Sequence, residues 1–169
     1  AVTRDYVLRL DTAKNGSREA RAPLLSVFGG KITTYRKLAE AALTELRPFF
    51  PQMKDAWTRH AVLPGGDLPP GGMATWQADL ARRYPEMPAS LLSALAHRHG
   101  TRVTALLGDA RRPGDLGEDF GLGLTEREID YLRNEEWAIG SEDILWRRTK
   151  CGLSMDARQR ERVAAFVGA

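Results

Sequence analysis

Proline and glycine interrupt the chain most densely between residues 51 and 73, and this segment constrains the fold more than any other feature. It contains Pro51, the run Pro64-Gly65-Gly66 and the run Pro69-Pro70-Gly71-Gly72. Proline cannot continue a helix or donate to a sheet ladder, and ordering glycine costs the most backbone entropy. We therefore predict a linker at residues 51–73 that separates two differently patterned parts, residues 1–50 and residues 74–169.

The first part has the pattern of a β-hairpin followed by a helix. Apolar residues alternate through residues 2–11, and a short apolar run at 24–28 predicts a second, buried strand that pairs with the first in antiparallel fashion. Apolar residues then recur at helical spacing from Tyr35, with Thr33 or Thr34 as the N-cap. A two-stranded hairpin is marginally stable by itself. We therefore expect this part to be the remnant of a larger α+β domain.

The second part is patterned for helices throughout. Thr125 and Glu128 have the spacing of a capping box, and Ser141 and Asp156 are candidate N-caps. The predicted fold class is mainly α, a C-terminal helical domain preceded by the hairpin and helix. Helices are predicted at residues 74–84, 88–99, 101–107, 125–137, 141–148 and from 156 onward.

Between the second predicted strand and its helix lies the run Gly29-Gly30-Lys31. Glycines let a ligand approach the backbone, and a helix N-terminus favours negative charge. A lysine there opposes the helix dipole, so a bound anion is a better explanation than an ordinary surface lysine. A phosphate-binding P-loop is excluded by spacing, because Leu25 and Ile32 occupy its required glycine and Ser/Thr positions. The run predicts an anion or cofactor corner.

The segment from Ser26 to Glu40 resembles the last flavin-contacting segment of FAD-dependent glycerol-3-phosphate dehydrogenases of the respiratory, quinone-reducing type. The resemblance covers nearly the whole chain, in the same order. It implies that the chain is the C-terminal part of such an enzyme, and that the dinucleotide fingerprint, absent here, lies in a preceding N-terminal part. The other matching runs are Thr3-Arg4-Asp5-Tyr6, Leu63-Pro64-Gly65-Gly66, Asp115-Leu116-Gly117-Glu118-Asp119-Phe120-Gly121, Glu136-Trp137 and Trp146-Arg147-Arg148-Thr149-Lys150.

The resemblance implies an oxidation of sn-glycerol 3-phosphate to dihydroxyacetone phosphate, with electrons passing through FAD to ubiquinone. Residues 1–169 alone are expected to be inactive. Arg4 and Lys31 are implied to bind the substrate and its phosphate, a task suited to a guanidinium fork and an ammonium group. The residues implied to contact the flavin are Gly29, Gly30, Lys31, Ile32 and Thr33.

Composition limits the partners. The net charge is only +3 with signs mixed along the chain, which argues against nucleic acid and leaves anionic lipid open. Cys151 is the single cysteine, so no intrachain disulfide exists, as is usual in a reducing compartment. His60, His97 and His99 lack metal-ligand spacing, so no metal site is predicted. The resemblance implies a cytoplasmic protein on the inner face of the cytoplasmic membrane.

An alternative assigns the helical part no catalytic role. It would then be a cap for homodimerisation or for peripheral membrane docking. Trp137 and Trp146, with the basic Arg147, Arg148 and Lys150, suit a membrane-surface element. Core tryptophans with a solvated basic flank are the commoner arrangement, and we favour it.

Overall fold

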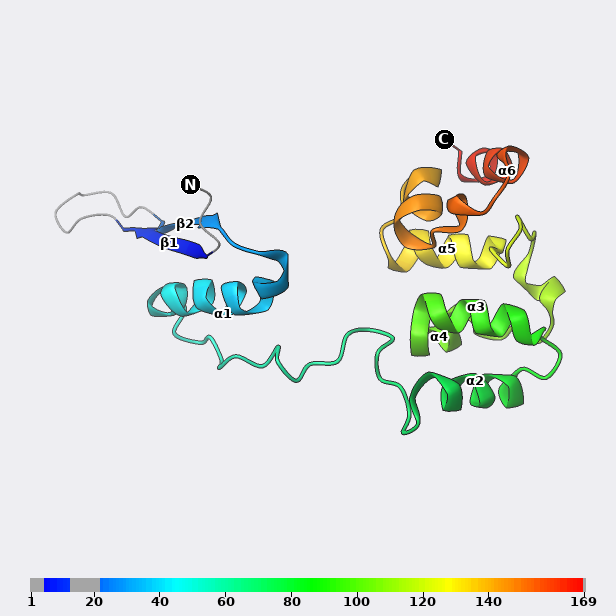
Figure 1. The fold of residues 1–169 in the computed structure, drawn as a ribbon, viewed down its shortest axis with the longest axis horizontal. Coiled ribbons are helices and arrows are strands. Elements are labelled where there is room, and N and C mark those ends of the chain that lie inside the picture. Colours follow the sequence, from blue (N-terminus) through cyan, green and yellow to red (C-terminus); the bar gives the residue numbers. More distant parts are fainter. Residues whose placement is uncertain (1–4, 13–21, 169) are drawn as a thin grey trace. The chain divides into compact units, whose positions relative to one another are not determined.

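The structure is a computed structural model that describes residues 5–12 and 22–168 (Figure 1). The chain divides into two compact units, residues 1–61 and residues 62–169. The division falls inside the proline- and glycine-rich segment at 51–73. We refer to these as unit 1 and unit 2.

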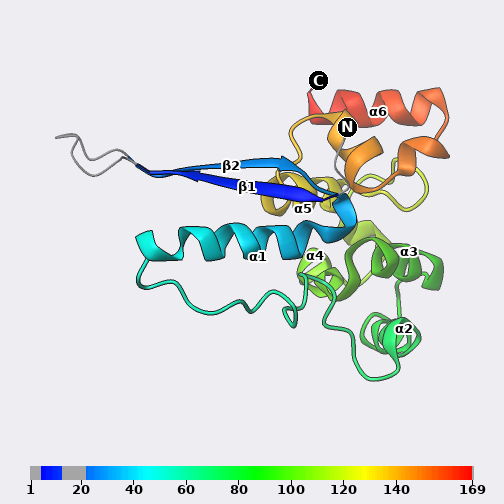
Figure 2. The same ribbon diagram turned by 60° about the vertical axis from the view of Figure 1, so that its left-hand side comes forward.

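Unit 1 is a two-stranded hairpin with a helix alongside it (Figure 2). Strand β1 (Tyr6–Asp11) pairs antiparallel with β2 (Leu24–Gly29), and Tyr6 lies opposite Gly29. A 3-10 turn (Ile32–Thr34) leads into helix α1 (Tyr35–Leu46), which a second turn (Arg47–Phe49) follows. The predicted hairpin and helix are confirmed. Helix α1 ends at a turn that contains Pro48, and this proline predicted the end of the helix from the sequence.

The prediction that β2 is buried was wrong. Leu24 is 62% exposed and Phe28 is 55% exposed. No residue in the described ranges 5–12 and 22–61 is buried. One helix against a two-stranded sheet cannot cover both faces of that sheet, so the apolar run remains open to solvent.

The predicted threonine cap of α1 was also wrong. The Thr34 hydroxyl donates to the Lys31 carbonyl at 3.1 Å, and the Thr34 N–H donates to the same oxygen at 3.0 Å. The hydroxyl thus closes the turn that precedes the helix and does not accept an N–H of its first turn.

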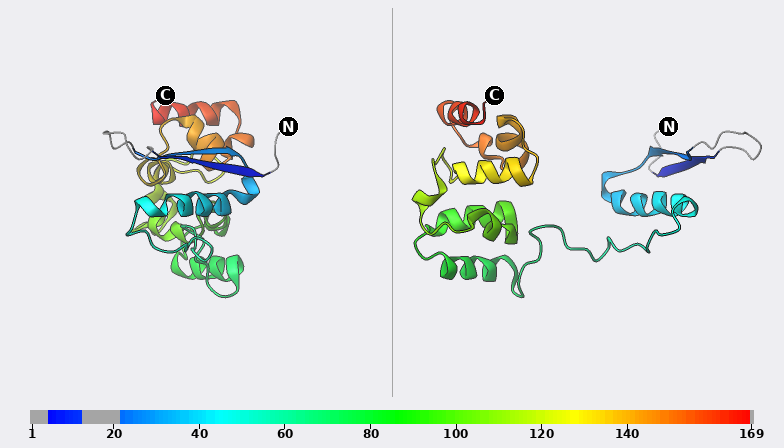
Figure 3. Two further views of the ribbon diagram at one scale, coloured as in Figure 1. Left: turned by 90° about the vertical axis from the view of Figure 1, so that its left-hand side faces the viewer. Right: turned by 180° about the vertical axis from the view of Figure 1, so that it is seen from behind.

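Unit 2 consists of helices in successive layers, with α2, then α3 and α4, then α5 and α6 (Figures 1 and 3). The mainly helical fold class is confirmed. Glycines at positive φ, including Gly100 and Gly108, end α3 and α4 as the sequence indicated. The elements are α2 (Gly72–Arg83), α3 (Ala89–His99), α4 (Val103–Leu107), α5 (Glu126–Glu135), a π-helix (Asp143–Arg148), α6 (Ala157–Val167) and the 3-10 turns Gly100–Arg102, Pro113–Leu116 and Cys151–Leu153.

One apolar core joins all the helices of unit 2. It includes the fully buried Leu80, Leu95, Leu107 and Ile129, one from each of α2 to α5. The Leu63-Pro64-Gly65-Gly66 run packs on the end of α3, where the Gly65 carbonyl accepts the N–H of Thr101 at 3.0 Å. This run therefore has a structural role.

Two of the three predicted caps in unit 2 need correction. Asp156 forms a full capping box with Gln159. Thr125 accepts the N–H of Glu128 at 3.4 Å, but the Glu128 carboxylate points elsewhere. Ser141 does not cap the π-helix; instead the Asp143 carboxylate accepts N–H groups from the preceding turn.

Gly152 is a position where no side chain fits. A Cβ atom there would lie 2.9 to 3.0 Å from three atoms of the Trp146 ring. The ring is held by its Nε1–H, which donates to Glu142 at 3.1 Å. The close approach of the Trp146 ring is therefore the reason for glycine at this position, since Gly152 does not have a positive φ.

We expect Gly152→Ala to lower the free energy of unfolding by about 1–3 kcal/mol, because the new methyl group overpacks against the ring. Urea denaturation followed by circular dichroism measures the change. Gly114→Ala is the control, since a Cβ there meets nothing within 4 Å. Equal effects of the two substitutions would contradict this packing argument.

Candidate functional site

The glycine–lysine corner follows β2 directly. Gly29 and Gly30 have φ values of 75° and 103°, a region that side chains other than hydrogen rarely adopt. A Cβ on Gly30 would also meet Leu38 at 3.3 Å. Lys31 is extended, with φ −115° and ψ 145°, and its side chain is exposed. The chain therefore turns here in a way that only glycine permits.

The corner presents backbone donors at a helix start. Ile32 and Thr33 lie in the first turn of the helical segment, where N–H groups have no intrahelical acceptor. Ile32 is 88% exposed and Tyr35 is 67% exposed. The structure thus places Gly29, Gly30, Lys31, Ile32 and Thr33 together on an open face. Arg4, the other predicted substrate-binding residue, lies outside the described residues.

A second constellation, which the sequence analysis did not predict, lies in unit 2. Glu128 on α5 is fully buried and accepts two hydrogen bonds from Arg98, at 2.7 and 2.6 Å. His99 adds a third contact, with Nε2 2.7 Å from the same carboxylate. The pKa of Arg98 is raised, because the hydrogen bonds and charge of Glu128 outweigh the burial that acts to lower it. Three polar side chains are thus mutually satisfied inside the core.

One signal for this cluster was present in the sequence. Glu128 lies at helical spacing from Leu124, Tyr131 and Leu132, all buried, so it falls on the apolar face of its helix. A carboxylate in such a stripe must find a partner. The capping-box interpretation, which placed Glu128 beside Thr125, concealed that signal.

Arg98 and His99 of this cluster line an open groove of about 700 Å³ in unit 2. The exposed Leu63 and Trp137 also line it, together with Arg102, Glu136 and Arg148. The groove carries both signs of charge. Such a lining lacks the single-sign field that concentrates a charged ligand.

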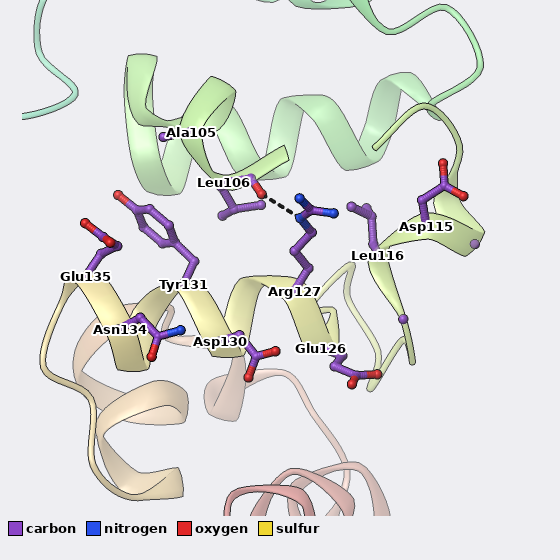
Figure 4. A pocket seen from close by; sticks show the side chains of 12 residues that line it. Ala105, Leu106, Asp115, Leu116, Glu126, Arg127, Asp130, Tyr131, Asn134 and Glu135 are labelled. Carbon is purple, nitrogen blue, oxygen red and sulfur yellow. Dashed lines mark hydrogen bonds between the residues drawn. The ribbon is translucent and has the colours of Figure 1, made fainter. Parts of the chain in front are cut away.

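Another hollow, of about 630 Å³, lies between α4 and α5 (Figure 4). Arg127 crosses it, donating from Nε to the Leu106 carbonyl at 3.1 Å and from Nη2 to Asp109 at 2.7 Å. Asp115 accepts the N–H groups of Arg111 and Arg112, which lower its pKa. Arg127 therefore joins α5 to the end of α4, and Asp115 closes the loop that follows, so these polar groups have structural roles.

The two tryptophans of the matching motifs differ. Trp146 is partly buried against the core, as the preferred interpretation predicted, but Trp137 is 84% exposed and contradicts it. Trp137 has φ 57°, a left-handed conformation that glycine usually adopts after a helix. Its neighbour Ile139 is 83% exposed, whereas Ala138 between them is buried.

Hydrogen bonds hold this turn in place. The N–H groups of Ile139 and Gly140 donate to Asp143 at 3.0 and 3.1 Å, and they lower its pKa. A lowered pKa means that this anchor is present at neutral pH and is lost as the pH falls through the depressed value. Two large apolar side chains are therefore displayed from an ordered turn.

Within the ranges 5–12 and 22–168, no group of three or more His, Cys, Asp or Glu side chains is arranged to hold a metal ion. In the same residues no helix is both long and apolar enough to cross a bilayer.

With this geometry in hand, comparison with known proteins decides the family. The family described as the C-terminal domain of alpha-glycerophosphate oxidase matches residues 56–168. The chain belongs to this family.

Individual relatives extend the match to unit 1. Glycerol-3-phosphate dehydrogenase of Pseudomonas aeruginosa is 49% identical over 167 residues, which are 99% of this chain and 31% of that protein. Aerobic glycerol-3-phosphate dehydrogenase of Escherichia coli is 47% identical, over 99% of this chain and 32% of its own length. D-erythritol 1-phosphate dehydrogenase of Brucella abortus is 43% identical, over 99% of this chain and 32% of its own length. The chain thus spans about a third of the length of these relatives.

In this family member, we expect Glu128→Gln to lower the free energy of unfolding by about 3–5 kcal/mol, because it leaves the Arg98 charge buried without its counter-charge. Chemical denaturation followed by tryptophan fluorescence measures the loss. Asp109→Asn removes an exposed partner of Arg127 and serves as the control, with a much smaller effect. A loss no larger than that of the control would show that the buried pair is not a major constraint.

Proposed function

We propose that the chain forms part of an FAD-dependent dehydrogenase that oxidises sn-glycerol 3-phosphate to dihydroxyacetone phosphate. The family match and the similarity to the two bacterial glycerol-3-phosphate dehydrogenases support this. The open corner at residues 29–33 is the observation that assigns this function to particular residues. There the positive charge of Lys31 lies beside the backbone N–H groups of the first helical turn.

The residues of the corner fit an anionic edge of a flavin. Gly29 and Gly30 bring no side chain that would obstruct a flat ring, and the N–H groups of Ile32 and Thr33 are oriented by a helix start. FAD, when bound, supplies the hydride acceptor. The donors of this chain would stabilise negative charge at the ring edge.

Lys31 would bind the substrate next to this edge. An ammonium group attracts both a phosphate and a hydroxyl that is losing its proton. Arg4 would add a bidentate contact to the phosphate. The residue that takes the hydroxyl proton is proposed to belong to another part of the enzyme.

The substrate named for the Brucella relative refines the proposed substrate class. D-erythritol 1-phosphate and glycerol 3-phosphate are both polyols that carry a phosphate on a primary carbon. A relative that is 43% identical over 99% of this chain acts on the first. We assign Lys31 and Arg4 to the shared phosphate, and place discrimination by polyol length outside this chain.

We expect Lys31→Ala in the complete enzyme to raise KM and to lower kcat/KM for glycerol 3-phosphate by about 100-fold, the loss of one charge-assisted contact of about 2–3 kcal/mol. Steady-state kinetics with an artificial electron acceptor measure both constants. Lys37→Ala, which removes an exposed lysine of the nearby helix α1, is the control. Near wild-type kinetics for Lys31→Ala would remove this residue from the site.

The electron acceptor and the location are also proposed. Ubiquinone, a lipid-soluble molecule, would accept the electrons, and the enzyme would sit on the inner face of the cytoplasmic membrane. Exposed Trp137 and Ile139 favour such a contact, because tryptophan and aliphatic side chains partition to the membrane interface. The nearby Arg147 is 2.8 Å from Asp143, so basic charge is partly neutralised there.

A second candidate function for unit 2 is therefore membrane docking through Trp137 and Ile139. We expect the chain to float with phosphatidylglycerol vesicles and the double substitution Trp137→Ala/Ile139→Ala to abolish flotation. Leu153→Ala, which removes a side chain 74% exposed, is the control and keeps binding. Absence of flotation by the unsubstituted chain at low salt would leave homodimerisation as the role of this surface, which analytical ultracentrifugation detects.

A further inference from the structure

His99 lies between the carboxylate of Glu128 on α5 and that of Glu136, the residue that follows α5. Its Nε2 is 2.7 Å from Oε1 of Glu128, and its Nδ1 is 3.8 Å from Oε1 of Glu136. The side chain is 4% exposed, whereas that of Glu136 is 31% exposed. The edge of Tyr131 contacts the His99 ring, with centroids 5.5 Å apart. One buried imidazole thus contacts a buried carboxylate on one side and a partly exposed one on the other.

Hydrogen-bond chemistry determines which nitrogen carries the first proton. Arg98 donates to both oxygens of the Glu128 carboxylate. An oxygen that accepts from Arg98 also accepts from His99, so Nε2 of His99 is the donor of the third hydrogen bond. In the neutral imidazole, Nδ1 then directs a lone pair toward Glu136, which is repulsive. A second proton on Nδ1 converts this contact into an attractive ion pair.

We propose that His99 is a proton-operated latch for the end of α5. Proton uptake at Nδ1 closes the pair with Glu136 and fixes the C-terminal turn of that helix. Loss of the proton opens the pair. The proton is exchanged with solvent, which reaches the partly exposed carboxylate of Glu136.

The latch acts next to the displayed tryptophan. Glu136 directly precedes Trp137, and the N–H groups of Glu136 and Ala138 both donate to the Leu132 carbonyl, at 3.1 and 3.0 Å. Trp137 takes a strained left-handed conformation between them. Holding the Glu136 side chain therefore restrains the turn from which Trp137 projects.

Other charges compete with the latch. Arg148 of the π-helix lies 3.7 Å from the other carboxylate oxygen of Glu136, so it offers that side chain a second positive partner. Arg98 places a fixed positive charge on the other side of the imidazole, which opposes protonation. The remaining titratable and charged groups of the packed elements are Arg102 of the 100–102 turn, Tyr131 and Glu135 of α5, and Cys151 of the 151–153 turn.

Nitrogen NMR of the histidine rings in the whole chain tests the proposal. The three histidines are assigned by substitution of His60 and His97, and spectra are recorded from pH 5 to 8.5. We expect His99 to gain its second proton at Nδ1, and the Trp137 indole N–H resonance to shift with the same midpoint. The latch is overturned if the His99 ring stays singly protonated across this pH range. It is also overturned if the chemical shift of the Trp137 indole N–H does not change when His99 gains its second proton.

Glu136→Gln isolates the carboxylate without removing the buried histidine. It should move the His99 midpoint to lower pH and abolish the Trp137 response. Glu135→Gln is the matched control, because it removes one neighbouring charge that pairs with Arg102 and not with His99. It should leave the Trp137 response intact, and equal effects of the two variants also overturn the latch.

Discussion

Unit 2 depends on the buried charge of Glu128. A carboxylate removed from water is costly, and here Arg98 and His99 of α3 compensate for it at hydrogen-bond distance. Arg98 also donates to the Gly123 carbonyl at 3.1 Å, which joins the loop before α5 to the same group. Since these contacts are directional, they determine how α3 and α5 lie against each other within an otherwise non-directional apolar core.

Unit 1, unlike unit 2, has no buried core among its described residues. Its hairpin and helix carry the glycine–lysine corner, yet none of its described residues is buried. Phe28, which precedes the corner, and Ile32 within it are open to solvent. An exposed apolar face of this kind is typical of a surface that contacts another protein segment or a ligand. The relatives are about three times as long as this chain, and the proposed flavin and substrate belong to that larger context.

Local signals account for what could be predicted. Proline and glycine punctuation, apolar period and helix-ending glycines indicated the hairpin, α1 and the helices of unit 2, often within two residues of their ends. The candidate corner could be located because its residues, 29 to 33, are contiguous. The family could be recognised for the same reason, since its motifs are short runs in a fixed order.

The sequence by itself thus determined the mainly helical class, the order of the elements and the residues of the corner, because each depends on neighbours along the chain. Only the tertiary structure decided that Glu128 is paired with Arg98 rather than capping its own helix, a contact across 30 positions. It also decided that Trp146 packs inward while Trp137 projects outward. Burial is a property of what lies opposite a side chain in space, and residue type alone does not specify that.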